Sequence, residues 1–124
     1  MNNRLTQENE VDDKKTITFT IHKDLKARLR ETLISSEKYN QRRKSDWVNE
    51  AIDMFTEVPD YTDIVMYADE SNSDFVFDKI YMTFNQRCNF SHIRAEVVRS
   101  QPNIRGPQAA IIRSAILIRL QSGL

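Results

Sequence analysis

Hydroxyl and apolar side chains alternate along residues 16–21 without a break. A period of two residues predicts a strand with one exposed face and one buried face. All six residues are β-branched or aromatic, which suits a pleated surface. The expected outward residues are Thr16, Thr18 and Thr20, and the expected inward residues are Ile17, Phe19 and Ile21.

The period becomes helical directly after this strand. Leu25, Leu29 and Leu33 fall on one face of a helix that we expect from about Lys23 to Lys38. A polar turn follows, and Ser45 is a suitable N-cap for a second helix, because its hydroxyl can bond the free amides of a first turn. The apolar face of that second helix contains Val48, Ala51, Ile52 and Phe55.

A strand and two helices within about 42 residues are too little to bury a core alone, and a lone strand needs a second strand. The segments TITFTIHKDLKARL (16–29) and KSDWVNEAIDMF (44–55) resemble the ribbon-helix-helix family of DNA-binding proteins, the Arc/MetJ/CopG group. In that family two strands pair antiparallel and enter the DNA major groove. The resemblance implies that the three outward threonines contact base edges, whereas on an ordinary strand they would simply face solvent.

Residues 79–124 repeat this order weakly. In the expected second strand, Ile80, Met82 and Phe84 alternate with the outward residues Lys79, Tyr81, Thr83 and Asn85. A short helical stripe follows at Phe90, Ile93 and Val97. Pro107 suits the first position of a last helix, and residues 109–120 are apolar on nearly every side, which predicts a buried central helix.

The spacing of the two halves agrees. Gln108 lies 24 residues after Phe84, as Ser45 lies 24 residues after Ile21, which indicates an internal duplication. The predicted fold is mainly α with a two-stranded antiparallel β-ribbon, a tandem ribbon-helix-helix in which strand-helix-helix occurs twice and forms an intrachain pseudo-dimer. Single-chain tandem members occur among plasmid transfer and mobilisation factors. The outward residues of both strands would then form one asymmetric DNA face.

The resemblance also implies which residues anchor DNA phosphates. The family binds the DNA backbone at the start of its second helix, where free amides and the helix dipole favour an anion. The residues at these positions are Arg42, Arg43, Lys44, Ser45 and Asp46 in the first half, and Gly106 and Gln108 in the second. Asp46 departs from the expected chemistry, since its carboxylate repels phosphate and only its amide would contribute. The competing interpretation of the basic cluster is a solvated loop.

Charge is distributed unevenly, although the formal net charge is +0. Residues 58–78 contain six acidic side chains and no basic one, whereas residues 79–124 contain seven basic side chains and Glu96 as the only acidic one. Residues 14–44 contain ten basic side chains and three acidic ones. Two basic segments around an acidic connector suggest a bipartite contact surface. The predicted organisation is a mobile tail (1–13), a first unit (14–57), an acidic connector packing on the core (58–78) and a second, divergent unit (79–124).

Candidate catalytic chemistry is sparse. His22 and His92 have no Cys or carboxylate neighbour at a metal-ligand spacing, and no glycine-rich phosphate loop is present. We expect no enzyme activity, no metal and no cofactor. Cys88 is the single cysteine, which excludes an intrachain disulfide and fits a reducing compartment; we expect it to be a small core residue. No apolar run reaches the length of a membrane span and no secretory signal is evident, so we expect a cytoplasmic protein.

The leading hypothesis is a sequence-specific double-stranded DNA-binding protein that acts as a transcriptional regulator or as an accessory factor of a plasmid or conjugative element. An alternative is an antitoxin-like repressor whose C-terminal half binds a partner protein through the helix at 109–120. A structural interaction protein without a DNA role is a third possibility. Self-association on DNA, or contact with a relaxase, a toxin or the transcription machinery, fits the first two hypotheses, and we expect no membrane partner.

Overall fold

The computed structural model describes residues 14–39, 43–65 and 74–123. Their elements are β1 (Lys15–His22), α2 (Lys23–Ser35), α3 (Lys44–Thr56), α4 (Tyr61–Ile64), β2 (Phe75–Met82), α5 (Phe84–Ser100) and α6 (Pro107–Ser122). The described part of the chain is therefore mainly helical, with one two-stranded antiparallel sheet, as the sequence predicts. The predicted tail at 1–13 and the middle of the predicted connector, at 66–73, lie outside the described residues.

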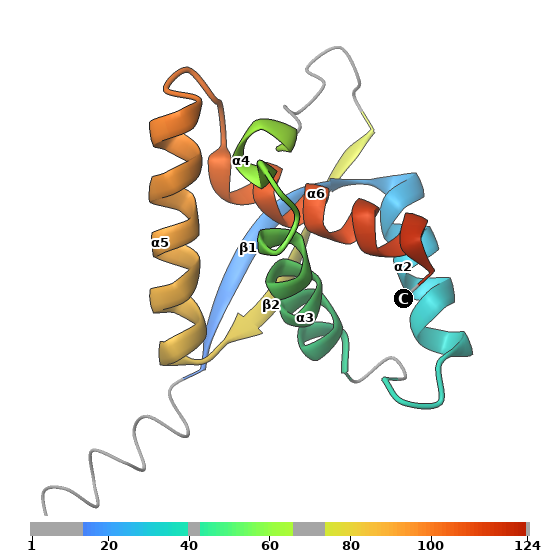
Figure 1. Ribbon diagram of the computed structural model, residues 1–124. Coiled ribbons are helices and arrows are strands. Elements are labelled where there is room, and N and C mark those ends of the chain that lie inside the picture. The colour runs from blue at the N-terminus through green and yellow to red at the C-terminus, as the bar shows by residue number, and fades with distance from the viewer. Residues whose placement is uncertain (1–13, 40–42, 66–73, 124) are drawn as a thin grey trace, which may run out of the picture.

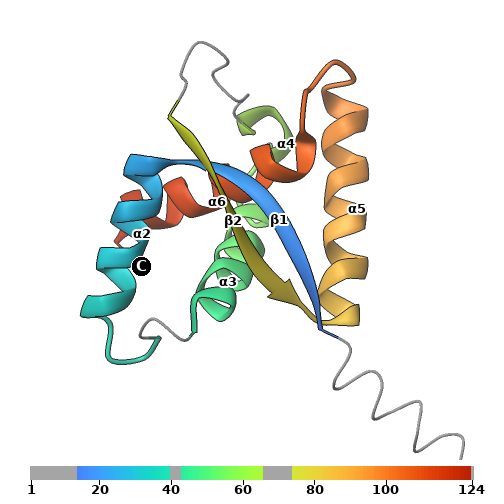
Figure 2. The same ribbon diagram turned by 180° about the vertical axis from the view of Figure 1, so that it is seen from behind.

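The two strands form a ribbon that lies across one side of the molecule. Helices α3 and α6 cross its inner face, and both make their main contacts with the strands and with each other (Figure 1). Seen from behind, the strands lie nearest the viewer and helices α2 and α5 stand on either side of them (Figure 2). The ribbon therefore has one face covered by helices and one face that no described helix covers.

The alternating pattern of β1 places its apolar residues in the core, because successive side chains of a strand point to opposite faces. Phe19 and Ile21 are 2% and 0% exposed, and Ile80 and Met82 of β2 are equally buried beside them. The predicted apolar faces of α2 and α3 are confirmed, since the residues assigned to them are all buried: Leu25, Leu29 and Leu33 in α2, and Val48, Ala51, Ile52 and Phe55 in α3. Trp47 also packs in the core.

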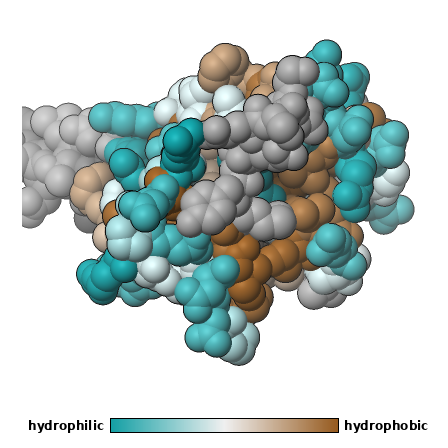
Figure 3. Space-filling view, turned by 90° about the horizontal axis from the view of Figure 1, so that it is seen from above, coloured by the Kyte–Doolittle hydropathy of each residue, from teal (hydrophilic) through white to brown (hydrophobic). Residues whose placement is uncertain are grey.

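Helix α6 is the central helix of the core, as its sequence predicts. Its fully buried residues are Ala110, Ile111, Ile112, Ala115 and Ile116. Leu117, Ile118 and Leu120, near the C-terminal end of the helix, remain partly exposed. Seen from above, the surface shows apolar residues in several places between hydrophilic ones, most of them near the middle of the view (Figure 3).

Some local predictions are wrong. Helix α2 ends at Ser35 rather than near Lys38, and the N-cap of α3 is Arg43, so that Ser45 lies inside the first turn. Cys88 is exposed rather than part of the core, because the apolar stripe of α5 is formed by Phe90, Ile93 and Val97 on another side of the helix. The first two differences shift element ends by a few residues, which is where sequence patterns constrain structure least, whereas Cys88 was assigned to the wrong face of its helix.

Candidate nucleic-acid interface

Six side chains form the uncovered face of the ribbon, which we call the ribbon face: Thr16, Thr18, Thr20, Phe77, Lys79 and Tyr81. The antiparallel register sets Thr16 opposite Tyr81, Thr18 opposite Lys79, and Thr20 opposite Phe77. Phe77 is 73% exposed and Tyr81 is 46% exposed, although both are large and partly apolar. The ribbon face thus combines hydroxyl groups, one cation and two aromatic rings on one face of a twisted two-stranded ribbon.

Thr83 and Asn85 were expected on this face, and that placement is wrong. Strand β2 ends at Met82 and helix α5 begins at Phe84, so Asn85 lies in the first turn of the helix. Thr83 is the N-cap: its hydroxyl accepts from the amide of Gln86 at 3.2 Å, and the Gln86 side chain accepts from the amide of Thr83 at 2.9 Å. This capping box stops the strand early and leaves Phe84 46% exposed instead of buried.

The ribbon face contains Phe77, which the sequence pattern did not place there, and lacks Thr83 and Asn85, which the pattern did. The strand begins at Phe75, four residues before the predicted start, inside the segment interpreted as connector. The residues Phe75, Val76 and Phe77 are all apolar, so the sequence pattern does not show which of them point toward the core. The Thr-x-x-Gln spacing at Thr83 is the signal that would have found the true boundary.

Side chains of α3 bond the outer edge of β2. The Ser45 hydroxyl accepts from the amide of Tyr81 at 2.9 Å, and the Asn49 side-chain amide donates to the carbonyl of Tyr81 at 3.0 Å. Asn49 is 7% exposed and lies on an otherwise apolar face of α3. A polar residue at such a position indicates a hydrogen-bond partner inside the fold, and this signal could have been found in the sequence. The backbone of Tyr81 is therefore satisfied on the side away from β1.

Side chains of α6 bond the outer edge of β1 in a similar way. The Gln108 side-chain amide donates to the carbonyl of Thr18 at 2.9 Å. Arg113 donates through Nη1 to both the carbonyl and the hydroxyl of Thr20, each at 2.8 Å. Arg113 is 6% exposed, and burial lowers the pKa of its guanidinium from an ordinary value far above neutrality. The Arg113 guanidinium thus binds the edge of β1 and does not face solvent. Its carbon lies 5.1 Å from the centroid of the Phe75 ring.

Lys44 forms an ion pair with Asp78 on the inner side of the ribbon. The distance from Nζ to Oδ1 is 2.6 Å, and the side chains are 31% and 6% exposed, respectively. Asp78 Oδ1 also accepts from the amide of Lys79 at 2.8 Å. Lys44 was expected at a DNA phosphate. The ion pair instead links the start of α3 to β2. Because an ammonium has three N–H donors, Nζ could still donate to a phosphate as well.

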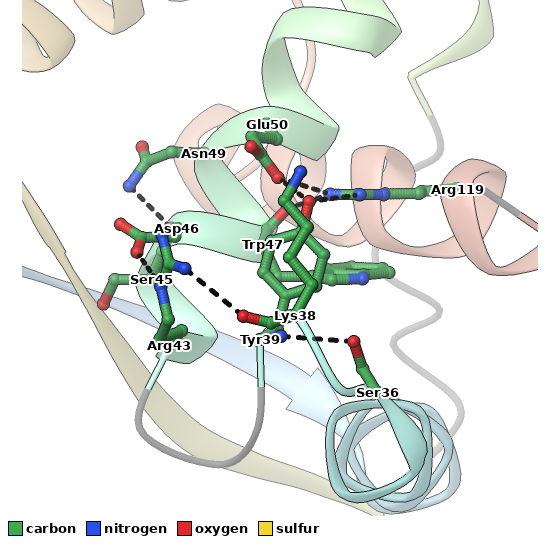
Figure 4. A network of polar contacts seen from close by, with 10 residues as sticks. All are labelled: Ser36, Lys38, Tyr39, Arg43, Ser45, Asp46, Trp47, Asn49, Glu50 and Arg119. Carbon is green, nitrogen blue, oxygen red and sulfur yellow. Dashed lines mark hydrogen bonds and ion pairs between the residues drawn. The ribbon is translucent and has the colours of Figure 1, made fainter.

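A polar network fixes the approach to α3 (Figure 4). Arg43 binds Asp46 with 2.8 Å between Nε and Oδ2, and it also donates to the carbonyl of Lys38. The carboxylate of Asp46 is thereby neutralised by its neighbour, which removes the repulsion that the sequence suggested. Arg119 of α6 donates to the carbonyl of Trp47 at 2.7 Å, and its guanidinium carbon lies 4.5 Å from the ring centroid of that residue.

The starts of α3 and α6 have no side-chain cap, in contrast to α5. The N-cap of α3 is Arg43, and the N-cap of α6 is Gly106 in the left-handed region at φ 52°, followed by Pro107. Since the first amides of a helix have no intrahelical acceptor, both starts carry partial positive charge. Ser45 and Gln108 hold these starts against opposite edges of the ribbon.

The predicted phosphate residues are thus brought to two places, one at each ribbon edge. Arg42 lies outside the described residues. Within the described ranges no cluster of three or more histidine, cysteine or acidic residues could hold a metal, and no helix there is long and apolar enough to cross a membrane. Comparisons with protein-family models, curated proteins and solved structures gave no match.

Proposed function

We propose that this chain is a single-chain ribbon-helix-helix protein that binds double-stranded DNA by inserting the ribbon face into the major groove. The observation that carries the proposal is a two-stranded ribbon with a buried inner face, hydrogen-bonded outer edges and an open outer face. A two-stranded ribbon fits the major groove, where each base pair shows a distinct donor and acceptor pattern.

The bonded edges favour a face contact over pairing with another strand. A protein partner that extends the sheet needs free amides and carbonyls at an edge. The backbone of Tyr81 on one edge, and the carbonyls of Thr18 and Thr20 on the other, already bond side chains of α3 and α6. At Tyr81 and at these two carbonyls an added strand would therefore compete with helix side chains, whereas the outward side chains of the ribbon are open.

The edge contacts also support a tandem arrangement. Thr20 lies three residues before the start of α2, and Tyr81 lies three residues before the start of α5. The carbonyl of Thr20 accepts from Arg113 in the second turn of α6, and that of Tyr81 accepts from Asn49 in the second turn of α3. Each strand edge is thus bonded by the second helix of the other half, as approximate two-fold symmetry requires.

The two uncapped helix starts flank the ribbon and would contact the phosphates on either side of the groove. Their free amides and positive dipole ends suit an anion, whereas Arg43 and Lys44 at one of them are already paired with Asp46 and Asp78 and could add only their remaining N–H donors. Phosphate contacts give affinity and orientation, whereas the ribbon face would select the sequence. Because β1 offers threonines and β2 offers Phe77, Lys79 and Tyr81, the preferred site would be asymmetric.

In a cell such a protein would act as a transcriptional regulator or as an accessory factor of a plasmid or conjugative element. The test begins by selecting duplexes from a random pool with the full chain. Thr18→Ala should weaken binding to the selected site by about three- to tenfold while leaving random DNA unchanged, because one base contact is lost. Thr62→Ala, on α4, is the control and should change neither affinity. Equal losses on selected and random DNA, or no duplex binding at all, would contradict the proposal.

A further inference from the structure

Thr20 and Phe77 are directly opposite each other on the ribbon face. The carbonyls of Thr18, Thr20 and Tyr81 point away from the partner strand, toward helix side chains. These residues therefore belong to non-hydrogen-bonded pairs of the ladder, and the pair of Thr20 with Phe77 is one of them. Side chains in such pairs lie closest together, so a hydroxyl and an aromatic ring form one composite surface.

Arg113 gives the Thr20 hydroxyl a direction. Its Nη1 donates to Oγ1 at 2.8 Å, so one lone pair of this oxygen is occupied by a buried cation. A hydroxyl that accepts from a guanidinium keeps its own proton free, which makes it a better donor than an ordinary threonine. The contact from the same Nη1 to the Thr20 carbonyl fixes the position of the guanidinium.

Phe77 supplies an apolar surface beside that donor. Its side chain is 73% exposed, and no packing inside the described chain accounts for a phenylalanine at this position. In the major groove, thymine is the base that presents a hydrogen-bond acceptor, O4, next to an apolar C5-methyl group. Cytosine presents a donor at the equivalent position, and neither purine has a methyl group there.

Resting on the proposed DNA-binding function, we infer that Thr20 and Phe77 form a thymine-reading pair: the Thr20 hydroxyl donates to O4, and the Phe77 ring packs on the C5-methyl of the same or the adjacent base. Arg113 is a positioning residue that orients the hydroxyl without touching DNA. Thr18 faces Lys79, which has no ring, and Thr16 faces Tyr81 without a described guanidinium contact like the one that Arg113 makes to the Thr20 hydroxyl, so the thymine requirement belongs to the Thr20 end of the site.

The test separates the two thymine groups by base substitution in the selected duplex. Each thymine is replaced in turn by uracil, which removes the methyl, by 5-methylcytosine, which keeps the methyl but exchanges the acceptor for a donor, and by cytosine, which changes both; guanine is placed opposite each cytosine so that the duplex contains no mismatch. Replacement of a thymine is expected to weaken the wild-type chain about three- to fivefold for uracil and about tenfold for 5-methylcytosine at one or two positions.

Variants of the full chain then assign each loss to a side chain. Phe77→Ala should abolish the discrimination between thymine and uracil at that position; because Phe77 is exposed, the variant should fold normally. Thr20→Val, which keeps the shape and the carbonyl contact to Arg113, should abolish the discrimination between thymine and 5-methylcytosine, and Thr20→Ser should retain it. A chain that selects a site but is indifferent to both substitutions overturns the inference alone, whereas a chain that binds no duplex overturns the proposed function as well. Methyl discrimination that survives in Phe77→Ala also overturns the inference.

Discussion

Lys44 compensates the buried carboxylate of Asp78, and removing the lysine charge measures the cost of leaving that carboxylate unpaired. Lys44→Met keeps most of the apolar stem but leaves Asp78 without its cation. The carboxylate is 6% exposed, and the contact it would keep is the amide of Lys79 at 2.8 Å. A buried charge that has lost its partner is strongly destabilising, because water cannot replace the interaction.

The expected loss of unfolding free energy in Lys44→Met follows from how deeply the ion pair is buried. Breaking a fully buried pair costs about 3–5 kcal/mol. Here Lys44 is 31% exposed and the pair borders a cavity of 190 Å³ that Leu29 and Leu33 also line, so solvent screens part of the interaction. We therefore expect Lys44→Met to lower the free energy of unfolding by about 2–3 kcal/mol at neutral pH. The pair of Arg43 and Asp46 is a matched comparison, since both side chains are about half exposed.

The assay is urea unfolding of the single variants and of Lys44→Met combined with Asp78→Asn. Arg43→Met should cost less than about 0.5 kcal/mol, as exposed pairs do. The double variant should be more stable than Lys44→Met alone, because the uncompensated charge is gone. The reasoning is refuted if Lys44→Met and Arg43→Met cost the same, or if adding Asp78→Asn to Lys44→Met recovers no stability.

Three further predictions concern other elements. Thr83→Ala should destabilise the fold by about 1 kcal/mol by removing the cap of α5 but should leave DNA selectivity unchanged; altered selectivity would return Thr83 to the interface. Gly106→Ala should cost about 1 kcal/mol in urea unfolding through its φ of 52° alone, because nothing lies within 4 Å of the added methyl, and a neutral result would argue against the left-handed N-cap. Burial and the hydrogen bond to Glu96 raise the pKa of Tyr61 to about 12, so the stability from its neutral phenol is complete below its ordinary pKa of 10.0 and is lost as pH rises through about 12. Stability should therefore fall more steeply over this interval in the wild type than in Tyr61→Phe, and identical slopes would contradict the assignment.

The first half of the fold could be predicted because its local patterns are strong. Strict alternation in β1 and leucines at helical spacing in α2 each define one face, and the structure buries those faces. The second strand was harder, because Phe75, Val76 and Phe77 are all apolar and give no period. Its start depends on pairing with β1, which is a contact between residues more than fifty positions apart.

The site could be predicted only in part for the same reason. The threonines of β1 lie on the uncovered face as their alternation predicts, but no local pattern places Phe77 beside Thr20. The partners of Lys44 and Thr20 are Asp78 and Arg113, which lie 34 and 93 residues away in the sequence. Such contacts depend on strand register and helix packing, which are set by the whole core rather than by neighbouring residues.

The most direct test of the account is an NMR titration of the isotope-labelled full chain with a selected DNA duplex. If the ribbon face binds DNA, the largest amide shift changes fall on residues 16–20 and 77–81 and on the starts of α3 and α6, while the outer side of α5 around Ser91 and Val98 stays unchanged. Shift changes centred on α5, with the ribbon unaffected, would contradict the claim that this ribbon is the surface that binds DNA.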